Sequence, residues 1–365
     1  MNKSAPFFAL AFLFCFTVSA QQNESRWTEQ KAWDWYNKQP WFCGFNYIPA
    51  YAINYTAMWD KTTFDAAAID KELALAEGLG MNCLRAVLQF AVYDEDSVYF
   101  LKTLDRFLSV CKKHNIRFMP ALFDDCVFGL EHDPKTGRQP EPLKDWYAWA
   151  WSPSPGHSLV IDSTTHPRIE RYVKAVLNRF KNDDRIFVWD LYNEPTNGGL
   201  GTATFPFLKK VIMWAREVAP LQPLTVGVWN GNQRLNDIVI AGSDVVSFHN
   251  YGNKESLGKQ IATLKQYSRP LINTEWMNRP AASVIETNLP VFYSEKVGCM
   301  LWGLVNGKTQ THLPWGHRPG DPPQTVWQHD LYKPDFTPYN IAELQMIKEY
   351  VSHSSQPDYI KQHRH

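Results

Sequence analysis

Residues 186–195 read IFVWDLYNEP, an apolar run that ends in the tripeptide Asn-Glu-Pro. The run over 186–192 predicts a buried strand, because a strand in a sheet covered by helices has no polar side. Apolar residues recur at helical spacing in residues 169–180 before it and in residues 205–218 after it. The tripeptide therefore stands where a strand between two helices ends.

The same alternation of strand-like and helical runs occurs about eight times along the chain. The expected strands are residues 41–47, 82–88, 117–123, 186–192, 224–228, 244–248, 271–274 and 299–305. The expected helices are residues 65–80, 101–111, 169–180, 205–218, 232–241, 257–267, 282–296 and 339–350. This pattern predicts the α/β class and a single closed (β/α)8 TIM barrel rather than an open doubly wound sheet. No GxGxxG or phosphate-binding loop follows the first strand, which disfavours a nucleotide-binding alternative.

The barrel fold predicts where function lies, namely in the loops that follow the strands at the C-terminal face. Two of these loops are long: residues 124–164 after the third strand and residues 306–338 after the eighth. Loops of this length inside a compact domain are usually functional.

Two glutamates fall at this face, Glu194 after the fourth strand and Glu275 at the end of the seventh. Retaining hydrolysis of a β-glycosidic bond needs two carboxyl groups about 5–5.5 Å apart, one protonated and one ionised. A single glutamate at a strand end is more often a solvated loop carboxylate. Two of them, at strands on different sides of one barrel, favour the paired chemistry.

The Asn-Glu-Pro after strand four, with a glutamate closing strand seven, resembles the clan A glycoside hydrolases and most closely the family 5, cellulase-like enzymes. The resemblance implies a retaining β-glycoside hydrolase that breaks O-glycosyl bonds. It implies that Glu194 is the general acid/base and Glu275 the nucleophile. By the same resemblance, Asn193 hydrogen-bonds the 2-hydroxyl of the sugar at the cleavage point. We expect repulsion from an ionised Glu275 to raise the pKa of Glu194.

The resemblance also extends to residues on other strands. Arg85 on strand two would keep Glu275 ionised, although a structural ion pair is the alternative. In the motif His-x-Tyr after strand six, Tyr251 would bond the nucleophile, and His249 would order the site or touch substrate. Trp302 on strand eight would form a flat floor for the sugar, with core packing as the alternative.

The sequence departs from many family 5 enzymes after strand three, where a histidine is common and this chain reads FDDC over residues 123–126. There Asp124 would either bond a substrate hydroxyl or cap the loop. Trp276, next to the second glutamate, is a candidate surface for stacking on sugar. Further aromatic candidates, each of which would otherwise pack in a loop, are Tyr47, Tyr51, Trp59 and Trp151.

Composition narrows the partners of the chain. Lys plus Arg and Asp plus Glu both number 37, so the formal net charge is zero. This balance disfavours nucleic acid and anionic membranes as partners, since both select basic surfaces. It favours a neutral carbohydrate substrate such as β-linked glucan, mannan or xylan. There is no CxxC and no zinc-like His/Cys spacing, so we expect no metal. We also expect no cofactor, and the sequence implies no partner protein.

The N-terminus predicts a signal peptide over residues 1–20 and a catalytic domain over residues 21–365. Lys3 precedes an apolar stretch at 7–18, which is too short to span a bilayer, and the small-residue sequence at 18–20 is a cleavage site. An uncleaved anchor is the alternative; a lipoprotein would need a small residue before Cys15, where Phe14 stands. We therefore expect export to the periplasm or beyond. Of six cysteines, five remain without Cys15, and an odd number cannot all pair within one chain.

Three other functions compete with hydrolysis. An idle barrel that only binds glycans would be expected to lose one carboxylate, and this chain has both. A transglycosidase would use the same residues and differ only in the acceptor. A metal-dependent hydrolase would need ligands clustered at several strand ends, where His249 is the one histidine that the pattern places.

Overall fold

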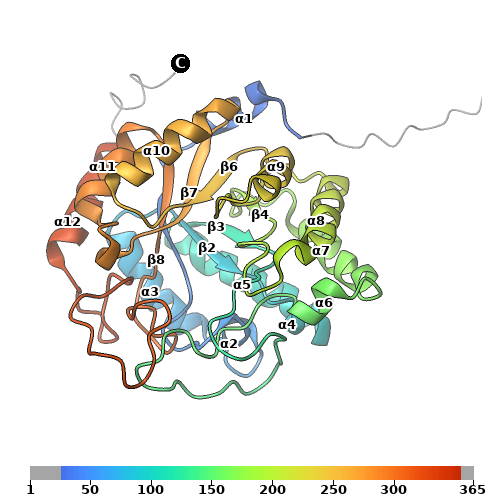
Figure 1. Cartoon of the computed structure of the whole chain (residues 1–365), viewed down its shortest axis with the longest axis horizontal. Helices are drawn as coiled ribbons and strands as arrows, with labels where there is room; N and C mark the ends of the chain where they lie inside the picture. The colour runs from blue at the N-terminus through green and yellow to red at the C-terminus, as the bar shows by residue number, and fades with distance from the viewer. Residues whose placement is uncertain (1–25, 355–365) are drawn as a thin grey trace, which may run out of the picture.

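The computed structural model describes residues 26–354, and its centre is one sheet of eight parallel strands (Figure 1). The strands follow one another around the sheet in the order β5-β4-β3-β2-β1-β8-β7-β6. Their bounds are β1 Cys43–Asn46, β2 Cys83–Val87, β3 Arg117–Ala121, β4 Trp189–Asp190, β5 Leu224–Thr225, β6 Val246–His249, β7 Leu271–Trp276 and β8 Gly298–Trp302.

Backbone hydrogen bonds also join the two strands at the ends of this order. Asp244 N donates to Leu224 O at 2.7 Å, and Val228 N donates to Ser247 O at 2.9 Å. His249 N in turn donates to Val228 O at 3.0 Å. The sheet therefore closes on itself, and the predicted (β/α)8 barrel is confirmed.

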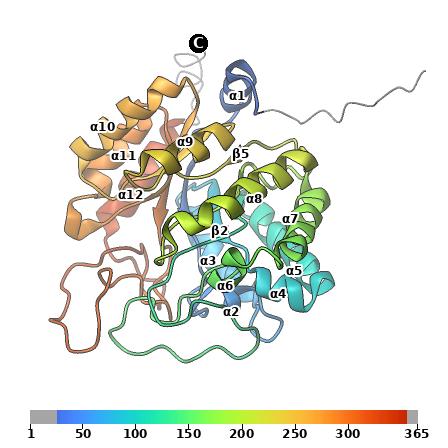
Figure 2. The ribbon, with the colours of Figure 1, turned by 45° about the vertical axis from the view of Figure 1, so that its right-hand side comes forward.

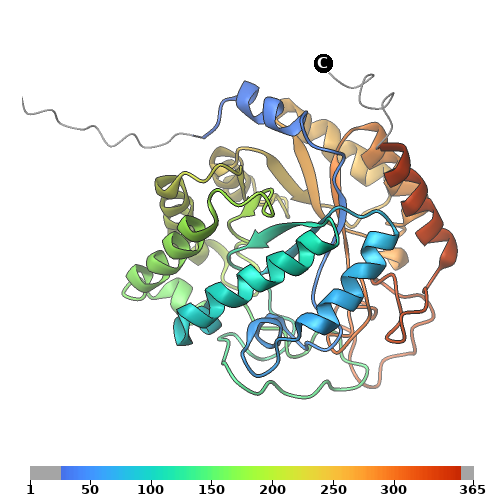
Figure 3. The ribbon, with the colours of Figure 1, turned by 180° about the vertical axis from the view of Figure 1, so that it is seen from behind.

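Helices cover the outside of the barrel, as Figures 2 and 3 show from two sides. The eight long ones are α3 Ala66–Gly78, α5 Ser97–Lys113, α7 His166–Phe180, α8 Phe205–Val218, α9 Gln233–Gly242, α10 Lys254–Leu264, α11 Ile285–Ser294 and α12 Ile341–Ser354. Several begin at a side-chain cap, such as Asp65 before α3 and Asn253 before α10, which satisfies backbone N–H groups that have no partner inside the helix.

The structure contains short helices that the sequence pattern did not predict. They are α1 Glu29–Tyr36, α2 Tyr55–Trp59, α4 Phe90–Glu95 and α6 His157–Ile161, with the 3-10 turns η1 Gly201–Thr204 and η3 Arg279–Ala281. A further 3-10 turn, η2 Lys265–Tyr267, forms the end of the helix predicted over residues 257–267. The two strands predicted as residues 186–192 and 224–228 have only two residues each in the sheet. In β4 the reason is local, because the Asp190 carboxylate accepts Tyr192 N at 3.2 Å in place of a backbone oxygen.

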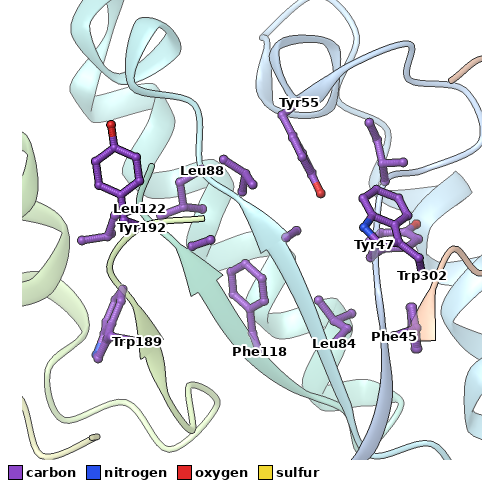
Figure 4. Close-up of a cluster of buried hydrophobic side chains, with 14 of the residues drawn as sticks. Phe45, Tyr47, Tyr55, Leu84, Leu88, Phe118, Leu122, Trp189, Tyr192 and Trp302 are labelled. Atoms are coloured by element: carbon purple, nitrogen blue, oxygen red, sulfur yellow. The ribbon is translucent and has the colours of Figure 1, made fainter. Parts of the chain in front are cut away.

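The two ends of the barrel differ. Helix α1 lies at one end, and the two long loops after β3 and β8 gather at the other (Figures 1–3). At the α1 end, Tyr36 packs with Phe42 and with Met119 and Met300 from the strands. Larger side chains, including Phe45, Leu84 and Phe118, fill the core around the strands (Figure 4). One end is therefore filled, which leaves the loop end for a cavity.

Two sequence expectations concern parts of the chain outside this core. The expected signal peptide at 1–20 lies outside the described residues. Over residues 26–354, no helix is long and apolar enough to cross a membrane. The five cysteines in this range are buried free thiols: Cys43, Cys83, Cys111, Cys126 and Cys299.

Candidate active site

A cavity of about 460 Å³ opens at the end of the barrel where the strands lead into the long loops. Both glutamates line it, together with Arg85, Asn193 and His249. The rest of its wall is largely aromatic, formed by Tyr55, Phe128, Tyr147, Trp151, Trp229, Tyr251, Trp302 and Trp315. A concave site with a few convergent polar groups among aromatic side chains is typical of a small-molecule or sugar site.

Glu275 extends from β7 into this cavity with both carboxylate oxygens already hydrogen-bonded. Arg85 Nη1 lies 2.7 Å from Oε1, and the Tyr251 hydroxyl donates to Oε2 at 2.6 Å. Arg85 and Glu275 thus form an ion pair in which both side chains are largely buried. Both neighbours therefore lie where the sequence predicted them.

Arg85 is itself held by three further acceptors. Its Nε donates to Asp190 Oδ2 at 2.8 Å, and its Nη1 and Nη2 donate to Asn46 and Asn193. Burial alone would lower its pKa, but the charges of Asp190 and Glu275 outweigh burial and raise the pKa of Arg85 above its usual value. The guanidinium is thus a fixed positive charge at the base of the cavity.

Glu194 accepts three hydrogen bonds from side chains. His249 Nδ1 lies 2.8 Å from Oε1, while Asn197 Nδ2 and Cys126 Sγ donate to Oε2 at 2.6 and 3.2 Å. Burial raises the pKa of Glu194, but the hydrogen bond and charge of His249 outweigh burial, and the net pKa lies below its usual value. The expected rise in the pKa of Glu194 is therefore wrong. The reason is the neighbouring His249, which lowers this pKa by more than burial raises it.

His249 shows the opposite shift. Burial lowers its pKa, but the charges of Glu275 and Glu194 outweigh burial and raise the pKa of His249. His249 Nδ1 is 2.8 Å from Glu194 and 3.6 Å from Glu275. The histidine therefore adjoins both carboxyl groups, and it is within hydrogen-bond distance of Glu194.

The two glutamates are close to each other. One oxygen from each carboxyl and one nitrogen of His249 all lie within 4.8 Å of one another. These three groups could hold a metal ion, and the sequence did not predict such a cluster. However, Glu275 already accepts from Arg85 and Tyr251 at both oxygens. A fixed guanidinium beside the cluster opposes a second cation, so the donor set suits a carboxyl pair better than a metal.

Asp124 does not reach the cavity. It is fully buried, and its carboxylate accepts Asn193 Nδ2, the backbone N of Cys126 and the indole N–H of Trp151, at 2.8 to 2.9 Å. Burial raises its pKa to about 6. The interpretation as a loop cap is therefore supported, and a bond from Asp124 to a substrate hydroxyl is not, because the side chain is 0% exposed and does not line the cavity. It orients Asn193, whose amide oxygen accepts from Arg85.

The two tryptophans on β7 and β8 differ in position. Trp302 lines the cavity, 5.7 Å from Trp151 between ring centroids. Trp276 is 1% exposed and packs against Phe292 of α11 at 5.1 Å, so its prediction as a sugar-stacking residue is wrong. Neighbouring residues of a strand point to opposite faces. Since Glu275 points into the barrel, Trp276 points to the helices.

The other aromatic candidates divide in the same way. Trp151 lines the cavity. Tyr47 is buried, with its hydroxyl on Glu72, and the indole N–H of Trp59 donates to Val87 O at 2.7 Å. The Tyr51 hydroxyl accepts Asp65 N at 3.1 Å, next to the start of α3, and Tyr51 is not among the residues lining the cavity.

Several lining residues were not among the predicted ones. Asn197 lies three residues after Glu194, and Cys126 lies two after Asp124, so proximity in sequence was the available signal. Tyr147 and Trp315 come from the middle of the long loops, where no periodicity marks a position. Trp229 follows β5 at a strand end, as the fold itself would suggest.

Comparison with known proteins identifies the family of the chain. The family model described as cellulase (glycosyl hydrolase family 5) matches residues 51–312. No curated protein matches the chain.

Solved structures share the fold at low identity. An exo-β-1,4-mannosidase from Opitutaceae bacterium strain TAV5 has 17% identity and a TM-score of 0.58 over 87% of this chain, which spans only 60% of that protein. A glycoside hydrolase family 5 mannosidase from Rhizomucor miehei has 14% identity and a TM-score of 0.56, covering 88% of this chain and 94% of that one. A broad-specificity endoglucanase from Clostridium longisporum has 9% identity and a TM-score of 0.58, covering 88% and 99%.

Proposed function

We propose that this chain cleaves β-linked sugars with retention of configuration. The chain belongs to glycosyl hydrolase family 5 and is a glycosidase that hydrolyses O-glycosyl bonds. The observation that carries the proposal is the proximity of the two glutamates, since an oxygen atom of one carboxyl group lies within 4.8 Å of an oxygen atom of the other. Retaining enzymes place their carboxyl groups about 5–5.5 Å apart, whereas inverting enzymes leave about 6.5–9.5 Å for a water molecule. The short separation supports direct attack by one carboxylate.

In the first step, a Glu275 oxygen attacks the anomeric carbon and forms a glycosyl ester while the bond to the leaving oxygen breaks. Glu194 gives that oxygen a proton. In the second step, Glu194 takes a proton from water, which attacks the anomeric carbon and releases Glu275. Arg85 and Tyr251 hold Glu275 in place for the attack.

His249 can supply the proton that Glu194 needs to act as an acid. The raised pKa of His249 and the lowered pKa of Glu194 favour a resting state in which the proton between them is on His249. Transfer across the 2.8 Å contact leaves the charge of the pair unchanged and protonates Glu194. Asn193 would bond the 2-hydroxyl, an interaction that strengthens as the transition state develops positive charge.

The proposed substrates are neutral β-linked glucan, mannan or xylan chains or their oligosaccharides. Two features support this class: the aromatic lining, which suits the apolar faces of sugar rings, and the zero formal net charge of the chain. The neighbouring structures carry the names mannosidase and endoglucanase, which fall within the class.

Covalent trapping tests the proposal. An aryl 2-deoxy-2-fluoro-β-glycoside with a good leaving group should accumulate the glycosyl ester, because the fluorine slows both steps while the reactive leaving group speeds only the first. Peptide mapping by mass spectrometry should find the sugar on Glu275. A label on another residue would assign the nucleophile to that residue. Hydrolysis that forms no ester and stops when a chelator is added would indicate a metal-dependent mechanism instead.

Two alternatives use the same residues. A transglycosidase would pass the sugar from Glu275 to another sugar instead of water, and product analysis with added acceptor sugar distinguishes it. An idle glycan-binding barrel would bind sugar without forming the ester. The intact hydrogen bonds of both glutamates favour an active site over an idle one.

We also propose export of the chain, supported by the signal-like pattern at 1–20. Expression of the full-length chain in a Gram-negative host should give a periplasmic or secreted product whose mass corresponds to a start at Gln21. Cytoplasmic protein of full-length mass would contradict export.

A further inference from the structure

The line from Glu194 to Glu275 divides the mouth of the barrel into two halves. Glu194 follows β4 and Glu275 ends β7. In the strand order of the barrel, β3, β2, β1 and β8 lie on one side between them, and β5 and β6 lie on the other. A glycan cleaved between these carboxyl groups must cross the line, with one part of the chain in each half.

The half over β3, β2, β1 and β8 has a continuous aromatic wall. Phe128 contacts Tyr147 at 5.1 Å and Trp151 at 5.6 Å between ring centroids. Trp151 in turn contacts Tyr55 at 5.1 Å and Trp302 at 5.7 Å. These five rings all line the cavity. We call them the aromatic wall.

The loops that carry this wall are tied to one another. Tyr147 N donates to His317 O at 3.0 Å, and Ala148 N donates to Thr309 O at 2.9 Å, which joins the loop after β3 to the loop after β8. Lys308 N donates to Ala50 O at 2.9 Å, which joins the loop after β8 to the loop after β1. Figures 1 and 2 show the two long loops gathered at this edge of the barrel.

A single side chain, that of Gln310, makes three further hydrogen bonds between the two long loops. The Gln310 amide N donates to Leu143 O at 2.6 Å and to Trp146 O at 3.3 Å, and its amide O accepts Asp145 N at 3.0 Å. Gln310 is not among the residues that line the cavity. It therefore holds the wall closed without touching the space for sugar.

The half over β5 and β6 is different. Its connections between strand and helix are short, since α9 begins eight residues after β5 ends and α10 begins five residues after β6 ends. Trp229 and Tyr251 line this half, and Trp315 from the loop after β8 packs against Tyr251 at 4.7 Å between ring centroids. Trp229 is held by an indole N–H bond to Pro195 O at 2.9 Å. Because the connections after β5 and β6 are short, a glycan can continue outward on this side past Trp229.

We propose that the enzyme acts from the non-reducing end and removes one terminal sugar at a time, an inference that rests on the proposed function. Asn193 is tied to Arg85 and Asp124, so the group that would bond the 2-hydroxyl belongs to the walled half. The sugar attacked by Glu275 thus lies against Trp302 and the aromatic wall. A further sugar on its non-reducing side would have to pass through tied loops, while the leaving group extends over Trp229.

Nitrophenyl glycosides test this directly. The probes are nitrophenyl β-glycosides of glucose, mannose and xylose, together with the matching β-1,4-linked nitrophenyl disaccharides. The monosaccharide probe of the preferred sugar should release nitrophenol at once. Its disaccharide probe should first lose the terminal sugar and release nitrophenol only after a lag, with direct disaccharide release slower by about tenfold or more. Free disaccharide released at the initial rate, faster than from the monosaccharide probe, would overturn the proposal.

Loop variants test what closes the pocket. Gln310→Ala removes the three ties and should raise direct disaccharide release relative to monosaccharide cleavage by about threefold or more. Gln324→Ala is the matched control, because Gln324 lies exposed in the same loop and bonds only Pro322 O. An equal ratio in both variants and in the parent would show that these ties do not close the pocket.

The failure of this inference differs from failure of the proposed function. Rapid internal cleavage with retention would leave the glutamate chemistry intact and reject the terminal action. A protein that cleaves none of the probes and forms no ester at Glu275 would reject both.

Discussion

Glu194 has a backbone φ of +42°, in the left-handed region that a residue with a Cβ adopts at a cost of about 1–2 kcal/mol. The strain is held by contacts of the side chain with His249, Asn197 and Cys126, which fix its carboxyl at the cavity. Thr196, two residues later, also has a positive φ of 86°. Strain of this kind persists where the surroundings determine the conformation, which is common at active sites.

This strain can be measured with two variants that lose the same carboxyl group. Glu194→Gly should be more stable than Glu194→Ala by about 1 kcal/mol, because glycine adopts positive φ without a Cβ clash. Thermal denaturation of the two proteins compares them directly. Equal stability, or a more stable alanine variant, would mean that the backbone at 194 is not strained.

The acid/base role of Glu194 predicts a specific pattern of activity. Glu194→Ala should lower kcat by about 10²–10⁴-fold on substrates with poor leaving groups, because it removes proton transfer. Aryl glycosides with good leaving groups should lose less, and azide should restore turnover and yield a β-glycosyl azide. Without any azide rescue on an activated aryl glycoside, the role would belong to another residue.

The pH dependence should be bell-shaped, with a basic limb set by the His249–Glu194 pair. The pKa of His249 is raised and that of Glu194 is lowered. The pair therefore keeps its proton at pH values below the raised pKa of His249 and loses it as the pH rises through that pKa. The basic limb of kcat/KM should therefore lie above about pH 6.5, the usual pKa of histidine. His249→Asn should move that limb, because Glu194 would then titrate alone. An unmoved limb would assign it to a different group.

Single residues show how far sequence reasoning reached at this scale. Glu194 and Glu275 could be placed at the cavity from the sequence, because a barrel brings strand ends together. Trp276 was misplaced although strand alternation could have corrected it, since it follows Glu275. Cys126 was missed because proximity to Asp124 in sequence was its only signal, and a lone cysteine does not indicate a bond to a carboxyl.

At the scale of elements, β1 and β2 approach each other unusually closely at Gly44. A Cβ added there would lie 1.9 Å from the backbone O of Cys83, an atom that cannot move without the strand. Gly78, near the end of α3, has nothing within 4 Å of such a Cβ. The two glycines therefore form a matched pair.

Gly44→Ala should destabilise the protein by at least about 3 kcal/mol, or prevent folding, because the clash is with backbone. Gly78→Ala should instead stabilise it by up to about 1 kcal/mol through better helix propensity. Denaturant unfolding measures both changes. A tolerated Gly44→Ala would mean that β1 and β2 can separate.

Most barrel elements could be predicted from periodicity, but their lengths could not. β4 and β5 are short because side chains such as Asp190 take over backbone hydrogen bonds, and this depends on tertiary contacts. The helices α2 and α4 escaped prediction because five or six residues carry too little helical pattern. Their side-chain caps, Asn54 and Gln89, were the remaining signal.

At the scale of the whole molecule, the barrel is filled at the α1 end and open at the loop end. Composition and alternation predicted the barrel and the long loops. They could not predict that the loops after β3 and β8 bond to each other, because those contacts join residues such as Tyr147 and His317, far apart in sequence and without a local pattern. The size and shape of the cavity come from these contacts.

The central claim is that Glu275 attacks the sugar directly while Glu194 assists from within 4.8 Å. Two successive displacements at the anomeric carbon restore its configuration. The most direct test is to follow hydrolysis of an aryl β-glycoside by NMR and to read the anomeric proton of the first sugar released, before mutarotation. The account predicts the β-anomer as the first product, and the α-anomer would contradict it.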